Sequence, residues 1–391
     1  MDHTSENLWI KNIKNPDKPL FSKATIENFN RAVSENIFSD KNSEPSHNFS
    51  RIIKRAGTFR AYAKKRILCE IEETITRSVK CDKFALSVKR ASIRSLPTNA
   101  NFHTEDIEID RIQETGIEIG EPVRVILRSG KWLYAKVPFY AGWIRENSVA
   151  YGTKNQVEEF YLSKDFCVVT GNYVYTMPSS DKSISFKRFG MGAKIPAGEA
   201  EEVGGEIHTN QIIVKIPVRN KGNLLIKNAF LSENADISHG YLSPTRKNIV
   251  KEALKLVGEP YGWGDSFEAR DCSGTIRSIY KTIGLELPRN ASEQEKMKLG
   301  IKKDFSGLST EEKLELLDEF QPGDLLFMQG HVMMYFGRIR GVHYIFHNFH
   351  RKYESGKTVA VNSALITPVQ IRFARNKTAI SEIRTGIIME E

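Results

Sequence analysis

The sequence predicts a multidomain α+β protein, and three observations lead to that prediction. The first is length, because 391 residues exceed what one ordinary core accommodates, so we expect two to four domains. The second is the order of hydrophobic periods along the chain, which are helical, then alternating, then helical again before a β-rich end. The third is a glycine-rich loop that delivers Cys272 to the start of a helix.

Composition narrows the classes of partner. The chain is 40% hydrophobic, as a globular protein should be, and its formal net charge is +9. This charge favours an anionic partner or surface, but no stretch interleaves tight basic clusters with aromatic residues, so we do not expect nucleic-acid binding. No run of eighteen apolar residues occurs, so we expect no integral membrane segment. We also expect a monomer.

The first residues and the cysteines bear on compartment and cofactors. The start, 1–6, has neither the basic nor the apolar region of a signal peptide, which predicts a cytoplasmic protein; a periplasmic or secreted protein is the alternative if a signal was removed. Four cysteines are few for this length, and none forms a C-x-x-C pair. We therefore expect no metal, no other cofactor and no disulfide framework, with a Cys69–Cys81 bridge left open.

Residues 1–84 are predicted to form a helical N-terminal segment. The stretch 22–37 places Ile26, Phe29 and Val33 on one face, and a second helical stretch runs from about 62 to 79. No motif in this segment carries chemistry, so we interpret it as packing.

Two small β units are predicted next, over residues 85–151 and 152–240. Short strands separated by tight turns, at the spacing seen here, are typical of a small β-barrel. We interpret Trp132 as a core residue, whereas core filling and ligand contact are both open for Trp143. The second unit repeats the strand–turn–strand pattern around 166–175 and 212–226.

Residues 241–391 are predicted to form an α+β domain, with helices first and an antiparallel sheet afterwards. Asp271 is a good helix N-cap, so Cys272 should lie in or next to the first turn of a helix. There the helix dipole and backbone N–H groups favour a thiolate, and we expect a lowered pKa for Cys272. The alternative is an inert cysteine in the core. Four apolar residues form one face of this helix: Ile276, Ile279, Tyr280 and Ile283.

A thiolate nucleophile needs a base, and the base needs a third group to orient it. The strand-like runs 330–337 and 341–348 predict a hairpin with a three-residue turn centred on Ile339. In that register His331 faces His347 directly on one side of the sheet, and His343 is the weaker candidate. The alternative is two ordinary polar positions, and a slip of one residue in the turn would move one histidine to the other face.

These residues resemble the NlpC family of papain-like cysteine peptidases, which cleave peptidoglycan peptides. By resemblance, Cys272 is the nucleophile, His331 the base and His347 the third polar residue of a papain-like α+β domain. The matching segments follow the order of the family: P-Y-G-W-G (260–264), D-C-S-G (271–274), L-P-R-N-A-S-E-Q (287–294), P-G-D-L-L-F (322–327), H-V-M-M-Y-F-G (331–337) and I-F-H (345–347).

The upstream β units resemble bacterial SH3-like domains, through G-E-P-V, S-G-K-W and G-W-I in the first. Some family members carry a helical segment and two such domains before the peptidase, and they act as γ-D-glutamyl-L-diamino acid endopeptidases on stem peptides or muropeptides with a free N-terminal L-Ala. In them the first SH3-like domain helps to wall off the substrate site. By resemblance, Tyr140 contacts the alanine end, Glu114 binds its amine, and three residues make the remaining contacts: Tyr261, Asp271 and Ser273.

Each of these contacts has a plainer alternative. Asp271 caps a helix in any case, Tyr261 is able simply to pack, and Glu114 is one of many exposed acids. Taken together, the sequence predicts a thiol hydrolase without metal or cofactor, acting on peptidoglycan stem peptides or muropeptides in wall turnover or recycling. Alternatives with the same Cys–His–His site are an amidase, an acyltransferase or a secreted effector that attacks a competitor's wall. A non-enzymatic alternative is a wall-binding protein with an inactive peptidase domain.

Overall fold

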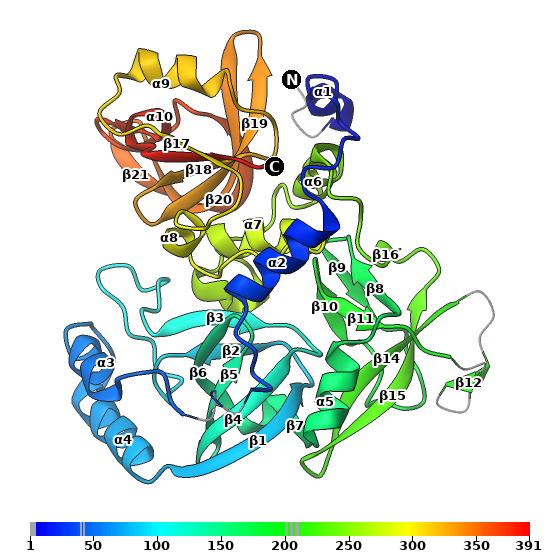
Figure 1. The fold of residues 1–391 in the computed structure, drawn as a ribbon. Helices are drawn as coiled ribbons and strands as arrows, with labels where there is room; N and C mark the ends of the chain where they lie inside the picture. Colours follow the sequence, from blue (N-terminus) through cyan, green and yellow to red (C-terminus); the bar gives the residue numbers. More distant parts are fainter. Residues whose placement is uncertain (1–4, 40, 42–43, 200–201, 204–205, 208–210) are drawn as a thin grey trace. The chain divides into compact units, whose positions relative to one another are not determined.

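The structure is a computed structural model that describes residues 5–391 except 40, 42–43, 200–201, 204–205 and 208–210 (Figure 1). Residues 1–4, on which part of the prediction of a cytoplasmic protein rests, lie outside the described residues. The chain divides into two compact units. The C-terminal unit contains Met1–Val33, Tyr241–Gly262 and Ala269–Glu391, and the central unit contains Ser34–Gly240 and Trp263–Glu268.

The C-terminal unit is built on an antiparallel six-stranded sheet in the order β17-β24-β18-β19-β20-β21 (Figure 1). Its helices are α1 (Glu6–Ile10), α2 (Lys23–Val33), α6 (Arg246–Lys255), α7 (Cys272–Lys281), α8 (Ala291–Gln294), α9 (Thr310–Leu317) and α10 (Ala379–Glu382). Its strands are β17 (Ile301–Asp304), β18 (Leu325–Met328), β19 (His331–Ile339), β20 (Val342–Glu354), β21 (Lys357–Pro368), β22 (Arg372–Ala374), β23 (Lys377–Thr378) and β24 (Thr385–Ile388).

Helix α7 buries the face that the sequence predicts. Ile276, Ile279, Tyr280 and Ile283 are each at most 2% exposed. On the sheet, a separate core forms around Phe305, with side chains of β18, β19 and α10. The expected order of helices followed by an antiparallel sheet is confirmed, and α7 contacts β19 and β20, the two strands that carry the histidines.

The N-terminal helices divide between the two units, so the prediction of one helical segment over 1–84 is wrong. Residues 5–33 belong to the C-terminal unit, where the Trp9 ring meets Phe336 edge-on at a centroid distance of 5.0 Å. The Asn30 side chain also donates to the carbonyl oxygen of Gly284 at 2.7 Å. Residues from Ser34 onward belong to the central unit. Periodicity identifies a helix but does not say which distant surface its apolar face covers.

The central unit contains a nine-stranded sheet in the order β14-β15-β7-β1-β4-β5-β6-β2-β3, and smaller sheets. Its helices are α3 (Phe49–Ala56), α4 (Lys64–Thr76) and α5 (Lys154–Tyr161), with short 3₁₀ segments at Glu146–Ser148 and Trp263–Glu268. Its strands are β1 (Val79–Ser87), β2 (Ala91–Arg94), β3 (Gln113–Ile117), β4 (Pro122–Ser129), β5 (Trp132–Val137), β6 (Tyr140–Arg145), β7 (Val149–Gly152), β8 (Phe166–Val169), β9 (Tyr173–Tyr175), β10 (Arg188–Gly190), β11 (Lys194–Pro196), β12 (Glu202–Val203), β13 (Glu206–Ile207), β14 (Gln211–Asn220), β15 (Asn223–Ser232) and β16 (Ile237–His239).

The two predicted β units share one sheet. The hairpin of β14 and β15 comes from the second predicted unit, yet Asn223 of β15 pairs with Tyr151 of β7 in the first. Each of the two predicted β units still has its own hydrophobic core, one around Leu133 and the other around Val214. The boundary at 151/152 therefore separates two cores but not two independent bodies, and the first strand begins at Val79, earlier than the predicted 85.

Two open questions from the sequence are answered by burial and by the cysteines. Trp143 is fully buried and packs against Tyr134 at a ring-centroid distance of 5.7 Å, so it fills the core. All four cysteines are free thiols, which excludes the Cys69–Cys81 bridge in this structure.

Within the described residues, every helix is too short or too polar to cross a membrane.

A buried ion pair holds α6 to the sheet of the C-terminal unit and generates a stability prediction. Arg246 Nη1 donates to Asp324 Oδ1 at 2.7 Å, and the Asp324 side chain is inaccessible to solvent. Burial raises the pKa of Asp324, and the Arg246 charge opposes that rise. Arg246→Met should lower the free energy of unfolding by about 3–5 kcal/mol, because it leaves a buried carboxyl group without its cation.

Urea-induced unfolding followed by circular dichroism measures this loss. The neighbouring Lys247→Met is the matched control, since Lys247 pairs with Asp17 at 3.0 Å on the surface and should contribute less than about 1 kcal/mol. Equal stability of the two variants would contradict the assignment of Arg246–Asp324 as a structural pair.

Candidate active site

Helix α7 begins at Cys272, and the predicted cap is confirmed. The Asp271 backbone is extended, and its Oδ1 accepts a hydrogen bond from the Gly274 N–H at 2.8 Å. Cys272 itself is 8% exposed. The cap fixes the first turn of the helix, so the thiol is presented from a rigid position.

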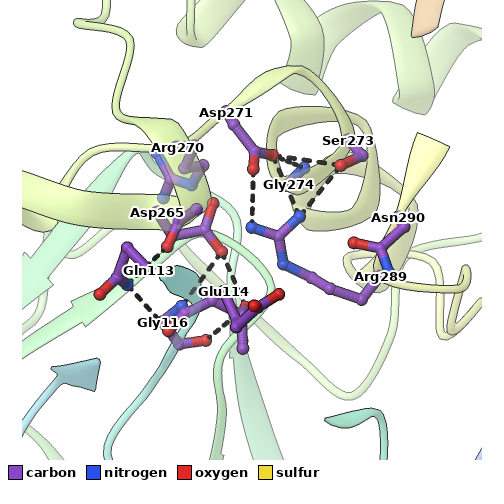
Figure 2. A network of polar contacts seen from close by, with 12 residues as sticks. Gln113, Glu114, Gly116, Asp265, Arg270, Asp271, Ser273, Gly274, Arg289 and Asn290 are labelled. Atoms are coloured by element: carbon purple, nitrogen blue, oxygen red, sulfur yellow. Dashed lines mark hydrogen bonds and ion pairs between the residues drawn. The ribbon is translucent and has the colours of Figure 1, made fainter. Parts of the chain in front are cut away.

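A buried arginine that the sequence reasoning did not single out completes this helix start. Arg289 Nη1 and Nη2 contact the two carboxylate oxygens of Asp271 at 3.1 and 2.8 Å (Figure 2). Arg289 Nη1 also donates to Ser273 Oγ at 3.0 Å. This bidentate pair compensates the charge of Asp271 and fixes Ser273 beside the thiol. The arginine lies within the segment 287–294, and that segment was the only signal for it in the sequence.

His331 and His347 contact one another in the C-terminal unit. His331 Nε2 lies 3.2 Å from His347 Nδ1, and His347 Nε2 lies 3.0 Å from Thr367 Oγ1. The His347 ring stacks on Phe349 at a centroid distance of 4.1 Å. Because the ring nitrogens are engaged by each other and by a hydroxyl, the arrangement is a hydrogen-bonded chain for proton transfer and orientation.

The predicted hairpin register is wrong, although the faces of the two histidines are right. Ile339 pairs with Val342 across a two-residue turn in which Arg340 and Gly341 both have positive φ, as a type I′ turn requires. That turn alone would put His347 on the face opposite His331. A β-bulge at Phe336 adds one unpaired residue and restores the common face. The two histidines therefore meet diagonally rather than directly opposite.

Cys272 is buried and His331 is half-buried, and desolvation disfavours the charged form of each. Burial raises the pKa of Cys272 to about 12; the Asp271 charge adds to this, while the backbone N–H of Val332 and the Arg289 charge oppose it. The contact with Val332 places the sulfur beside β19, next to His331 in the chain. Burial lowers the pKa of His331 to about 4. The prediction of a lowered Cys272 pKa is wrong because desolvation outweighs the helix start.

Asn348 is a second residue that no local sequence motif indicates. It is 2% exposed and lies on β20, next to His347. Its Nδ2 donates to the Arg270 carbonyl oxygen at 2.9 Å and contacts Thr275 Oγ1 at 3.1 Å. This amide therefore joins the strand of the third polar residue to both sides of the Asp271–Cys272 turn.

The remaining predicted residues have local contacts. Tyr261 is half-buried, its N–H donates to the Asn362 carbonyl oxygen at 3.0 Å, and its ring lies 6.0 Å from that of His350. In the central unit, the Tyr140 hydroxyl donates to Glu114 Oε2 at 2.5 Å. The structure thus forms two groups, with Glu114 and Tyr140 in the central unit and the other six residues in the C-terminal unit. His343, the weaker candidate, contacts the Tyr335 hydroxyl at 2.8 Å.

Sequence comparisons match two segments of the chain. The sequence model of the NlpC/P60 family matches residues 258–368, and that of the SH3 domain (SH3b1 type) matches residues 98–145. Dipeptidyl-peptidase 6 of Lysinibacillus sphaericus is 24% identical over 254 residues, which are 62% of this chain and 84% of that protein. Gamma-D-glutamyl-L-lysine dipeptidyl-peptidase of Bacillus subtilis (strain 168) is 24% identical over 228 residues, 56% of this chain and 64% of that protein. About a third of the second relative is thus left unmatched.

Two solved structures resemble the fold. An NlpC/P60 endopeptidase from Photobacterium damselae subsp. piscicida has a TM-score of 0.78 at 20% identity, covering 97% of this chain and 96% of that one. An NlpC/P60 family protein from Bacillus cereus ATCC 10987 has a TM-score of 0.53 at 19% identity, covering 79% and 100%. At these identities the likeness concerns the fold, and it confirms the predicted multidomain α+β class.

The raised pKa of Cys272 makes a prediction for thiol chemistry. Because the Cys272 pKa is about 12, its thiolate fraction at pH 7 is on the order of one in a hundred thousand. Iodoacetamide should therefore label Cys272 more than about a hundredfold more slowly than the exposed Cys69, with a rate that rises about tenfold per pH unit between pH 7 and 10. Peptide mapping by mass spectrometry separates the two cysteines. Fast labelling that does not depend on pH in this range would show a thiolate–imidazolium pair at rest.

Proposed function

We propose that this chain, whose residues 258–368 form an NlpC/P60 cysteine peptidase domain, cleaves the γ-D-glutamyl–diamino acid bond of peptidoglycan stem peptides with a free N-terminal L-Ala. The single observation that carries the enzymatic part is the hydrogen bond between His331 and His347, in the same unit as a cysteine at a helix start. The choice of bond is supported by the relatives named γ-D-glutamyl-L-lysine dipeptidyl-peptidase. A dipeptidyl-peptidase removes two residues from a free amino end.

Proton transfer follows from the hydrogen-bonded chain. Because His347 Nε2 faces the Thr367 hydroxyl and its Nδ1 faces His331, we assign the Nε2 proton of His331 to the bond with His347. His331 Nδ1 is then the nitrogen that takes the proton of Cys272. Since the pKa values of thiol and base are far apart, the proton moves as the sulfur attacks the carbonyl carbon. His331 then protonates the leaving amine, and water hydrolyses the acyl-enzyme.

The oxyanion is assigned to the first turn of α7. A helix leaves its first N–H groups without partners in the helix itself. Here the Gly274 N–H is bound by the Asp271 side chain, the Thr275 N–H by the Asp271 carbonyl, and the Ser273 N–H by the Cys272 sulfur. The Cys272 N–H is therefore the donor that we place on the developing oxyanion.

Recognition of the free amine is assigned to acids. Glu114 is the first candidate, because the Tyr140 hydroxyl holds its carboxylate and thus pre-orients it. Asp271 is the second, with the difference that its charge is shared with Arg289. Tyr261 and Ser273 are proposed as further contacts to the peptide. A need for a free amine would restrict cleavage to peptides already released from glycan, which fits recycling or turnover, and cytoplasmic location stays a prediction.

Removal of the thiol tests the enzymatic part. Cys272→Ala should abolish hydrolysis of L-Ala-γ-D-Glu-diaminopimelate, by at least about a thousandfold, because no other group replaces the nucleophile. The control is Cys167→Ala, which removes another buried thiol that lies 3.6 Å from His239 Nδ1, and it should leave the rate within about twofold. Mass spectrometry of the products measures both. Hydrolysis that survives Cys272→Ala would mean a different site, whereas wall binding without hydrolysis by the wild type would favour a non-catalytic protein.

The amine requirement has its own test. Acetylation of the substrate's alanine amine should lower kcat/KM about a hundredfold or more, because it removes one charge of a partly desolvated pair. Glu114→Gln should narrow the difference between the free and acetylated peptides, and Glu159→Gln, an exposed acid on α5, should not. Equal rates on both peptides would refute the requirement itself. A difference unchanged by Glu114→Gln would assign the amine to another acid.

A further inference from the structure

The loop that precedes the nucleophile is held by contacts within the central unit. Residues 263–268 belong to the central unit, whereas Gly262 and Ala269 belong to the C-terminal unit. The ends of this loop are joined in the C-terminal unit, where the Gly262 N–H donates to the Arg270 carbonyl oxygen at 3.0 Å. Asp271 and Cys272 follow directly. We refer to residues 263–268 as the approach loop.

The approach loop has a strained backbone. Gly264, Asp265, Phe267 and Glu268 all have φ between 56 and 58°. Residues with side chains avoid this left-handed region, Asp least among them, whereas Phe is rarely found there. Such a run persists only where the surroundings hold it, and strain of this kind gathers at functional sites.

Strand β3 of the central unit holds the first half of the loop. Asp265 Oδ2 accepts from the Thr115 hydroxyl at 3.2 Å, and Gln113 Nε2 donates to the Gly264 carbonyl oxygen at 2.8 Å. Gly264 lies so close to β3 that a Cβ atom there would be 2.7 Å from the Gln113 carbonyl oxygen. Only glycine fits this position, on account of both its φ and this close approach.

Arg188 of β10 holds the second half. Its guanidinium forms an ion pair with the Glu268 carboxylate, and its Nη2 donates to the Glu268 carbonyl oxygen at 2.7 Å. The guanidinium also lies over the Tyr173 ring, 3.8 Å from its centroid. One immobilised side chain thus fixes both the side chain and the backbone of Glu268, three residues before Asp271.

We propose that Arg188 and Asp265 are positioning residues for Cys272. By holding the approach loop in its left-handed conformation, they fix the direction in which the chain enters α7, and with it the place of the thiol and of the Cys272 N–H. Neither residue needs to touch the substrate for this role. The inference rests on the proposed function for its substrate assay, but its thiol assay is independent of any substrate.

The test compares Arg188→Met with the wild type. The variant keeps a long side chain and loses both contacts to Glu268. We expect kcat on L-Ala-γ-D-Glu-diaminopimelate to fall at least about tenfold with KM within about twofold, since a displacement of about 1 Å at the reacting atoms costs on the order of a hundredfold in rate. Labelling of Cys272 by iodoacetamide at pH 9 should become several-fold faster, because burial is what protects the thiol. Arg188→Lys keeps a cation for the Glu268 carboxylate. Its kcat and its labelling rate should therefore lie between those of Arg188→Met and the wild type.

Lys227→Met is the matched control in the same unit. Lys227 pairs with Asp181 at 2.6 Å and also contacts Ser183, away from the approach loop, so its loss should leave kcat and labelling unchanged. Melting temperatures check that each variant is folded, and Asp265→Ala repeats the test if Arg188→Met is not. Variants at 188 and 265 that behave like Lys227→Met in both assays would overturn the positioning role. If the wild type does not cleave the peptide, the proposed function fails, and the labelling comparison still decides this inference.

Discussion

Desolvation of the thiol and its base is the constraint on which the site depends. Cys272 and His331 lie where neither favours its charged form, so a charge that appears during the reaction must be stabilised by groups already in place. Arg289 holds Asp271 and compensates its charge, and His347 holds the His331 ring. The Asn348 amide holds the turn at Asp271 and Cys272. Pairing with Arg289 lowers the free-energy cost of burying the Asp271 carboxylate at this helix start.

Local rules identified the nucleophile and its helix from the sequence. A cap residue, a cysteine and an apolar face are separated by a few positions, and each obeys geometry that depends only on neighbours in the chain. The sequence does not indicate a role for Arg289 or Asn348, because their partners lie far away along the chain or on another element. Nothing nearby in the chain distinguishes them from ordinary polar residues. The pKa of Cys272 was mispredicted for a related reason, since burial is a property of the whole fold.

The fold was predictable in class but not in how its parts are grouped. Alternating and helical periods gave the order of elements, and burial confirms the face of α7. The grouping follows from long-range contacts, such as Trp9 against Phe336 or Asn223 opposite Tyr151, which no periodicity encodes. The histidine hairpin shows the same limit on a smaller scale. An odd-length turn without a bulge and an even-length turn with one bulge put the same residues on the same face, so the prediction of facing side chains was right although the pairing was wrong.

That equivalence has a consequence for how the hairpin can change through evolution. If the turn gained one residue and the bulge residue were lost, both histidine rings would stay on the same face of the sheet. The same holds for the reverse exchange. Loss of the bulge alone would separate His331 from His347 while leaving every residue of the motif in place. Phe336 is the bulged residue, and it is packed by Trp9, more than three hundred positions earlier in the chain. The bulge that brings the two histidine rings to one face is therefore packed by a segment from the other end of the chain.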